Sequence, residues 1–144
     1  MSNIAAILSA SGREWRKVQG ASDSELAKLI GALPFDLPSE YMDLLRFSNG
    51  GEGELAFEPC WFQLFDVTFA LQLWHDPAYR VNYPNLFFFG SNGGMEYIAF
   101  DMTQTRPWHI VMVDCIAGIK SARRLSEDIK SFIQSLGLRN GYGA

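Results

Sequence analysis

Apolar residues recur at intervals of three and four positions toward both ends of the chain, whereas the middle alternates apolar and polar residues. The first spacing is that of one buried helix face, and the second is that of a half-buried strand. The pattern predicts helices over residues 4–8, 23–32 and 38–48, and a last helix that begins after a cap at Ser126 and ends before Gly137. The apolar stripe expected in the second of these helices consists of Leu26, Leu29, Ile30 and Leu33.

The expected helix ends carry recognisable capping residues. Ser22 and Glu25 form a capping-box pair at the start of the second helix. Pro38 suits the first position of the third helix, where a missing N–H costs nothing. The run from Asn49 to Gly51 then supplies residues that tolerate positive φ and stop that helix.

The middle of the chain predicts strands. The strand candidates are residues 54–58, 61–65, 86–89, 95–100 and 109–113, the last of which is expected to continue through 116–119. Asn92-Gly93 favours a tight hairpin turn between two of them. Residues 69–74 are expected to form a short helix, followed by a loop to Asn85. Because helices cluster at the two ends, the order indicates an α+β fold, with helices packed on an antiparallel sheet of about four to six strands.

The composition is that of a packed globular protein. At 144 residues the chain fits a single domain, and 14% of its residues are aromatic, which argues against disorder. No apolar run approaches the roughly 20 residues of a membrane-spanning helix. A signal peptide has a basic residue before its apolar stretch, whereas no basic residue precedes the first apolar stretch here. We therefore expect a cytoplasmic protein with no membrane partner. Cys60 and Cys115 are expected to be reduced thiols, buried as small hydrophobes.

Acidic residues concentrate in the middle of the chain. The net charge is −4, but residues 21–101 hold twelve acidic and three basic side chains, a local charge of −9. Such a block repels polyanions, so nucleic acid is not expected as the primary ligand. It would attract a basic partner and speed the encounter. The alternative, in which these acids only keep the surface solvated, stays open at this point.

Two cysteines and two histidines are the candidates for a catalytic or metal-binding site. Cys60 or Cys115 could pair with His75 or His109 as a thiol and an imidazole. Activation would need a partly exposed thiolate beside a cation, and both cysteines sit among apolar residues. The same four residues lack the spacing of a zinc finger. We therefore expect no metal site, no cofactor and no enzymatic activity.

Three further features have both a structural and a chemical interpretation. The run from Gly50 to Gly53 could be mistaken for a phosphate loop, but it follows a helix and leads into acids, which favours a structural turn. Glu54 and Glu58 would share one face of a strand, which fits a hydrolase pair or, more simply, a charged exterior. Asp101 is expected to accept hydrogen bonds from N–H groups of the turn that follows it.

The residues expected to bind a partner are acids of the middle segment and two tyrosines in the loop before Asn85. Exposed aromatic side chains anchor protein interfaces, and these tyrosines are the best candidates for that role. The expected partner-binding residues are Glu52, Glu54, Glu58, Asp66, Asp76, Tyr79 and Tyr83.

Two strings resemble the signature of a known family. One reads Leu-Pro-x-x-Tyr-x-x-Leu-Leu from Leu37 and is followed by Asn-Gly-Gly-x-Gly from Asn49. The other is an aromatic strand that runs from Leu86 through a glycine-rich turn to Asp101. Together they resemble the SMI1/KNR4 family, also called the SUKH superfamily, over about residues 22–136. The positions that match the family motifs are Leu37, Pro38, Tyr41, Asn49, Gly50, Gly51, Gly90, Gly93 and Asp101.

The resemblance implies an SMI1/KNR4-like α+β domain and a function in binding. Bacterial members resemble immunity proteins of polymorphic or contact-dependent toxin systems, each of which binds a cognate toxin domain, often a nuclease. The resemblance therefore implies an immunity protein whose partner is a toxin with a basic surface. Two alternatives stay open: an intracellular scaffold or regulatory module, and a small-ligand-binding domain.

Overall fold

Seven strands form one antiparallel sheet whose order follows the chain. The computed structural model describes residues 3–139, and within them each strand pairs with its neighbours in sequence. The strands are β1 (Trp15–Arg16), β2 (Glu52–Glu54), β3 (Trp61–Leu64), β4 (Leu86–Ser91), β5 (Glu96–Asp101), β6 (His109–Asp114) and β7 (Arg123–Ser126). The expected α+β class and antiparallel sheet are confirmed, although the sheet is wider than expected.

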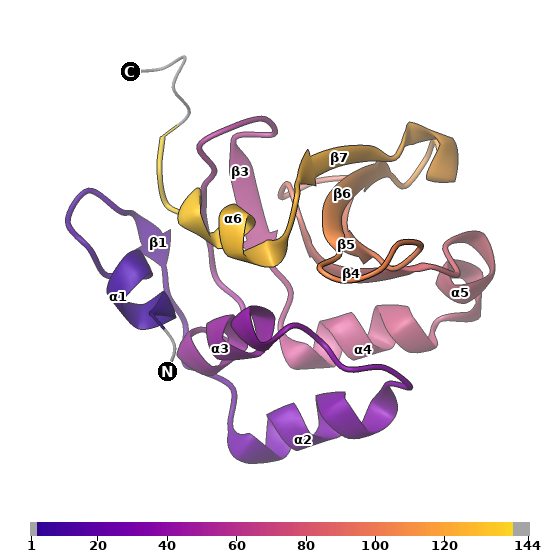
Figure 1. The fold of residues 1–144 in the computed structure, drawn as a ribbon, viewed down its shortest axis with the longest axis horizontal. Helices are drawn as coiled ribbons and strands as arrows, with labels where there is room; N and C mark the ends of the chain where they lie inside the picture. Colours follow the sequence, from indigo (N-terminus) through magenta and orange to yellow (C-terminus); the bar gives the residue numbers. More distant parts are fainter. Residues whose placement is uncertain (1–2, 140–144) are drawn as a thin grey trace.

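Helices from both ends and from the middle of the described chain pack against this sheet. They are α1 (Ile4–Leu8), α2 (Asp23–Ala32), α3 (Ser39–Phe47), α4 (Val67–His75), α5 (Pro77–Asn82) and α6 (Ile129–Gln134), with a 3-10 turn η1 (Ile119–Ser121). Figure 1 shows α2, α3 and α4 gathered along one side of the strands, with α5 beyond the end of α4. Near the C-terminus, α6 packs on α3, β6 and β7.

The ends of α2 and α3 follow from their capping residues. The Ser22 hydroxyl accepts the Glu25 N–H at 3.1 Å, and the Glu25 carboxylate accepts the Ser22 N–H at 2.9 Å. These hydrogen bonds hold the pKa of Glu25 below its usual value. Pro38 is the N-cap of α3 and so lies one position before the expected one. The assignment of Ile30 to the core is wrong, because its side chain is 59% exposed.

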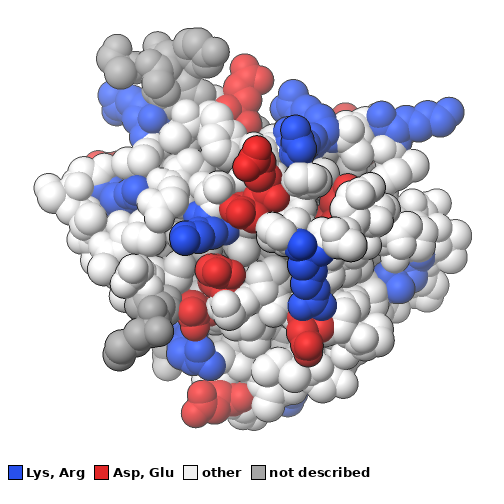
Figure 2. Space-filling view, in the orientation of Figure 1, with Lys and Arg blue, Asp and Glu red and all other residues white. Residues whose placement is uncertain are grey.

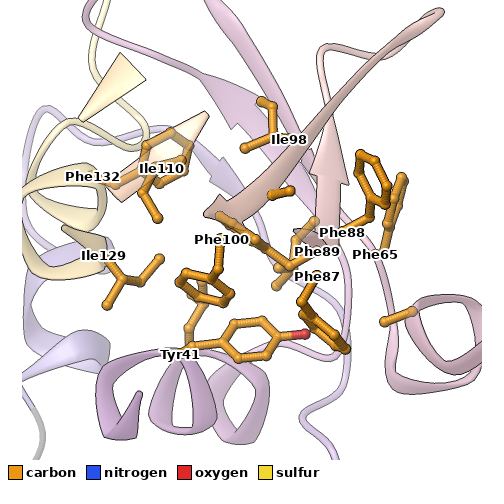
Figure 3. Close-up of a cluster of buried hydrophobic side chains, with 14 of the residues drawn as sticks. Tyr41, Phe65, Phe87, Phe88, Phe89, Ile98, Phe100, Ile110, Ile129 and Phe132 are labelled. Atoms are coloured by element: carbon orange, nitrogen blue, oxygen red, sulfur yellow. The ribbon is translucent and has the colours of Figure 1, made fainter. Parts of the chain in front are cut away.

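An aromatic cluster between α3 and the sheet forms the centre of the core. Figure 3 shows Tyr41 reaching from α3 toward the rings on β4 and β5. Its ring lies 5.5 Å from that of Phe89 and 5.4 Å from that of Phe100, edge to face in both cases. Phe132 of α6 closes the cluster against Phe62 and Phe89. Such pairs add roughly 0.5–1.5 kcal/mol each beyond burial, so they fix α3 and α6 on the same face of the sheet.

The opposite face of the sheet is covered in part by α5. Tyr79 and Tyr83 pack edge-on against Phe88 of β4, and Tyr79 stacks on Tyr97 of β5 at 6.1 Å. The expectation of a loop with two exposed tyrosines is therefore wrong. Pro77 begins a helix at the position where proline is well tolerated. Tyr83 is only 6% exposed, so it belongs to the core.

The C-terminal part of the sheet differs from the sequence prediction. β7 was not expected, because its exposed arginines hide the apolar pattern of a strand. The continuation of β6 through 116–119 is wrong: the chain turns instead, and Ile116 is 80% exposed. Ser126 ends β7, so it does not cap α6. That role belongs to Asp128, whose carboxylate accepts the Ser131 N–H at 2.8 Å.

Two expectations for the segment after β2 are also wrong. β2 ends at Glu54, and Glu58 lies in the following turn, so the two carboxylates do not share one strand face. Cys60 is exposed at the end of this turn, with a φ of 72°, and is not a buried hydrophobe. The alternating pattern of residues 54–58 thus reflects a turn that buries Leu55 and exposes its neighbours in part.

We predict that Tyr41→Phe keeps or raises stability. The Tyr41 hydroxyl is buried and has no hydrogen-bond partner among residues 3–139, so its removal relieves a desolvation penalty. Denaturant unfolding should show a variant up to about 1 kcal/mol more stable than the wild type. The control, Tyr97→Phe, removes a hydroxyl from a ring that is only partly buried and should stay within about 0.5 kcal/mol of the wild type. A Tyr41→Phe variant that is less stable than Tyr97→Phe would contradict this interpretation.

Alkaline pH should separate the same variant from the wild type. Burial raises the pKa of Tyr41 well above its ordinary value of 10.0, and the nearby Asp66 carboxylate adds to the shift. Above pH 10 the unfolded chain releases a proton that the folded chain keeps, so stability falls as pH rises. We predict that the wild type loses roughly 1.4 kcal/mol per pH unit more than Tyr41→Phe above that pH. Urea unfolding at several alkaline pH values measures the two slopes, and equal slopes would refute the prediction.

Candidate functional site

The chain makes a tight junction where α3 ends and β2 begins. Ser48 is fully buried there, and its hydroxyl donates to the Gly50 carbonyl oxygen at 2.7 Å. The same hydroxyl oxygen accepts the Val18 N–H at 3.2 Å and the Trp15 indole N–H at 3.3 Å. One side chain therefore joins the end of α3 to the segment around β1.

Asn49 connects this junction to two further helices. Its Nδ2 donates to the Glu25 carboxylate of α2 at 3.2 Å, and its Oδ1 accepts the Val67 N–H at the start of α4 at 2.9 Å. Its backbone N–H donates to the Gln19 carbonyl oxygen at 3.0 Å. Both ends of the amide are used inside the fold, so Asn49 positions α2, α3 and α4 relative to one another.

Gly50 and Gly51 complete the junction with backbone conformations that favour glycine. Their φ angles are 114° and 99°, which lie in the region that side chains rarely adopt. A Cβ on Gly51 would lie 2.6 Å from the Arg16 carbonyl oxygen and 2.9 Å from the Ser48 hydroxyl oxygen. Only a hydrogen atom fits at that place. The run from Gly50 is therefore a structural turn, as expected.

A groove of about 520 Å³ opens beside this turn, and we call it the motif groove. Gln63 of β3, Ser91 of β4 and Tyr97 of β5 line it, and their cross-strand pairing places all three on one face of the sheet. Asp66 and Phe69, from the start of α4, form one wall. The Asn-Gly-Gly turn forms another. The groove thus lies on the face opposite the aromatic core.

Polar groups along the sheet side of the motif groove are hydrogen-bonded to one another. The Ser91 hydroxyl donates to Gln63 Oε1 at 3.2 Å and accepts the Gly93 N–H at 3.0 Å. Glu52 lies directly across from Gln63 in the β2–β3 register, so both side chains share one face. The Glu52 carboxylate accepts the Trp61 indole N–H at 2.9 Å. This face therefore presents polar groups that are held in place.

Comparison with known proteins assigns the fold to a family. The model of the SMI1 / KNR4 family (SUKH-1) matches residues 20–135. The chain belongs to this family. The resemblance expected over about residues 22–136 is thereby confirmed, and SUKH domains are known as a class of immunity-type domains. We found no significant match among curated proteins. Within residues 3–139, the helices are too short or too polar to cross a membrane.

The acids expected to bind a partner lie at different places on this SUKH-1 domain. Asp66 lines the motif groove, and Glu52 lies next to Gln63 on the same face. Glu54 follows two positions along β2, and Glu58 is exposed in the next turn. Asp76 caps α5 and lines a different groove, between α2 and α4. On the face drawn in Figure 2, basic and acidic side chains are interspersed and neither sign forms a continuous patch.

Tyr79, Tyr83 and Cys115 form a titratable cluster near α5 in the SUKH-1 domain, in which Tyr83 is buried and the other two side chains are partly buried. Burial raises the pKa of all three side chains. Tyr79 stacks on Tyr97, and the nearby Cys115 adds to the rise in the pKa of Tyr79 that burial causes. A thiol with a raised pKa is a poor nucleophile at neutral pH, and Cys115 is only partly buried, in contrast to the expectation. In the part of the chain that the structure describes, no three His, Cys, Asp or Glu side chains could hold a metal ion.

Other SUKH-1 motif positions have structural roles. A Cβ on Gly90 would overlap the Phe62 ring, so glycine lets β3 and β4 approach closely. Gly93 has a φ of 89° in the hairpin turn. Asp101 accepts the N–H and the hydroxyl of Thr103 at 3.0 and 2.6 Å, which confirms its expected role in the turn.

We predict that Asn49→Ala destabilises the SUKH-1 domain by about 2–3 kcal/mol. The change removes two side-chain hydrogen bonds and leaves the Val67 N–H without its acceptor. Asn85→Ala is the matched control, because Asn85 is exposed and its side chain lies outside this network. The control should stay within about 0.5 kcal/mol of the wild type. Equal losses in the two variants, measured by denaturant unfolding, would remove the structural role given to Asn49.

Proposed function

We propose that this SUKH-1 domain is an immunity protein that binds a cognate toxin domain and neutralises it. The toxin would belong to a polymorphic or contact-dependent system and carry a basic surface, as a nuclease does. The family match supports this proposal, because SUKH domains are known as immunity-type domains. The mode of action would be binding to the toxin rather than chemistry on it.

The motif groove supports the proposal most strongly, because it is a preformed surface with polar and aromatic groups. It combines a carboxylate, an amide and aromatic rings on one side of the sheet. Its wall at Asn49 is tied to α2 and α4 by hydrogen bonds, so the groove is formed before a partner arrives. A preformed surface loses little conformational entropy on binding, and nearby acids speed the approach of a basic partner.

Binding of a small ligand in the same groove is the second candidate. The volume of about 520 Å³ falls within the range of small-molecule sites, which is about 300–1,000 Å³. A metabolite that binds only the folded chain would raise the melting temperature, and the rise would grow with the logarithm of its concentration above the dissociation constant. A toxin domain that raises it at stoichiometric concentration would favour the first candidate.

We predict that the purified protein inhibits, at a 1:1 ratio, the toxin domain encoded beside its gene. The double reversal Glu54→Lys/Glu58→Lys should slow association about tenfold or more at low salt, because it removes electrostatic steering. The matched control is Asp36→Lys/Glu127→Lys, which makes the same change in net charge at exposed sites away from the β2 segment. It should slow association less than about threefold. Stopped-flow fluorescence gives these rates.

Inhibition of the toxin and electrostatic steering by Glu54 and Glu58 can be contradicted independently. A toxin domain that stays fully active in excess wild-type protein would contradict the immunity function. Equal slowing in the two reversal variants would leave the immunity function intact, but it would show that net charge acts rather than the acids of the β2 segment.

A further inference from the structure

Two polar groups of the motif groove have unused hydrogen-bonding capacity. The Ser91 hydroxyl donates a hydrogen bond to Gln63 Oε1, whereas the Gln63 amide nitrogen has no hydrogen-bond partner among residues 3–139. Asp66 uses Oδ1 to cap α4, accepting the Phe69 N–H at 2.8 Å, and its Oδ2 accepts no hydrogen bond from the described chain. Asp66 is also exposed. The groove therefore offers a ligand one amide donor from the sheet and one carboxylate oxygen from the wall.

Aromatic rings line the same groove. Phe65 packs edge-on against Phe69 at 4.6 Å and against Tyr97 at 5.2 Å. Stacking of the Tyr79 ring on the Tyr97 ring holds Tyr97 in place. A carboxylate beside aromatic rings suits a cation, since both attract positive charge. A guanidinium group suits it best, because its plane can stack on a ring while its N–H groups reach a carboxylate.

An anion would not be favoured in the motif groove, although a helix begins there. The N–H groups of Val67 and Phe69 in the first turn of α4 are already hydrogen-bonded to side chains. Asp66 and the neighbouring Glu52 would repel an anion. Arg16 lies opposite Glu52 in the β1–β2 register, but its guanidinium stacks over the Trp61 ring and forms no ion pair within the described residues.

We propose that the motif groove receives an arginine side chain of the partner protein. Its guanidinium pairs with Asp66 Oδ2 and lies against the Tyr97 ring, and the Gln63 amide donates to a carbonyl oxygen of the partner's backbone. An apolar side chain would leave both polar groups without partners, which is unfavourable once water is excluded. The identity of the partner rests on the proposed function, but the arginine site can be tested without the toxin.

The probe is the capped tripeptide acetyl-Gly-Arg-Gly-amide, titrated into ¹⁵N-labelled protein and followed by NMR. One side chain binds weakly, so we expect a dissociation constant on the order of 1–10 mM. Saturable shifts should appear at Gly51, Gln63, Ser91 and Tyr97. The same peptide with citrulline in place of arginine keeps the shape and loses the charge, so it should bind about fivefold or more weakly. A lysine peptide should also bind less tightly than the arginine peptide.

A pair of variants tests the carboxylate. Asp66→Asn removes the charge but keeps a good helix cap, so the fold is retained. It should weaken binding of the arginine peptide about fivefold or more. Asp76→Asn makes the same change at the cap of α5, outside the motif groove, and should change the affinity less than about twofold.

Several outcomes would overturn the arginine site. The first is the absence of saturable shifts in the groove up to about 50 mM arginine peptide. The second is a citrulline peptide that binds as tightly as the arginine peptide, or a lysine peptide that binds more tightly. The third is an Asp66→Asn variant whose affinity for the arginine peptide is unchanged. Because no toxin is present, each of these outcomes leaves the immunity function standing. Conversely, the expected peptide binding in a protein that does not inhibit the toxin would support the site and refute the immunity function.

Discussion

The close approach of three chain segments at Gly51 is the constraint on which the rest of the structure depends. The Arg16 carbonyl oxygen and the Ser48 hydroxyl oxygen leave room for a hydrogen atom but not for a Cβ. This contact allows the short β1 to join the sheet beside β2. The Ser48 hydroxyl and the Asn49 amide then attach the end of α3 to the segment around β1, α2 and α4. One wall of the motif groove is therefore part of the folded core rather than a separate loop.

The two faces of the sheet have different roles. One face is apolar and carries the aromatic cluster that fixes α3 and α6, with Tyr41 and Phe132 on the helices and Phe89 between them. The other face is only partly covered, by α5 through Tyr79. Its uncovered part presents Gln63 and the groove beside it. A rigid, buried face thus supports a second face whose uncovered part is polar, and a partner that bound there would cost the chain little conformational entropy.

Local signals in the sequence predicted much of the fold. Capping residues located α2 and α3, and the Asn-Gly turn located the β4–β5 hairpin, because these features act within a few residues. β1 and β7 were missed, since one has two residues and the other carries exposed arginines. In each case tertiary pairing, rather than local pattern, decides the structure.

The candidate site could be predicted only in part. The Asn-Gly-Gly string indicated a structural turn, but no local pattern shows that Asn49 reaches α2 and α4. The motif groove joins residues that are far apart in sequence, such as Gln63 and Tyr97, so it follows from the strand register and from where α4 and the Asn-Gly-Gly turn lie beside the sheet. The loop expected before Asn85 predicts Tyr83 as an exposed anchor, whereas its contact with Phe88 buries it.

The central claim is that this SUKH-1 domain acts by binding a protein through the motif groove. Hydrogen–deuterium exchange of the chain, with and without the bound toxin domain, tests it most directly. We expect exchange to slow most over residues 49–52, 63–69 and 91–97, which surround the groove. Protection confined to the opposite edge of the sheet, at β6 and β7, with unchanged exchange around the groove, would contradict the claim.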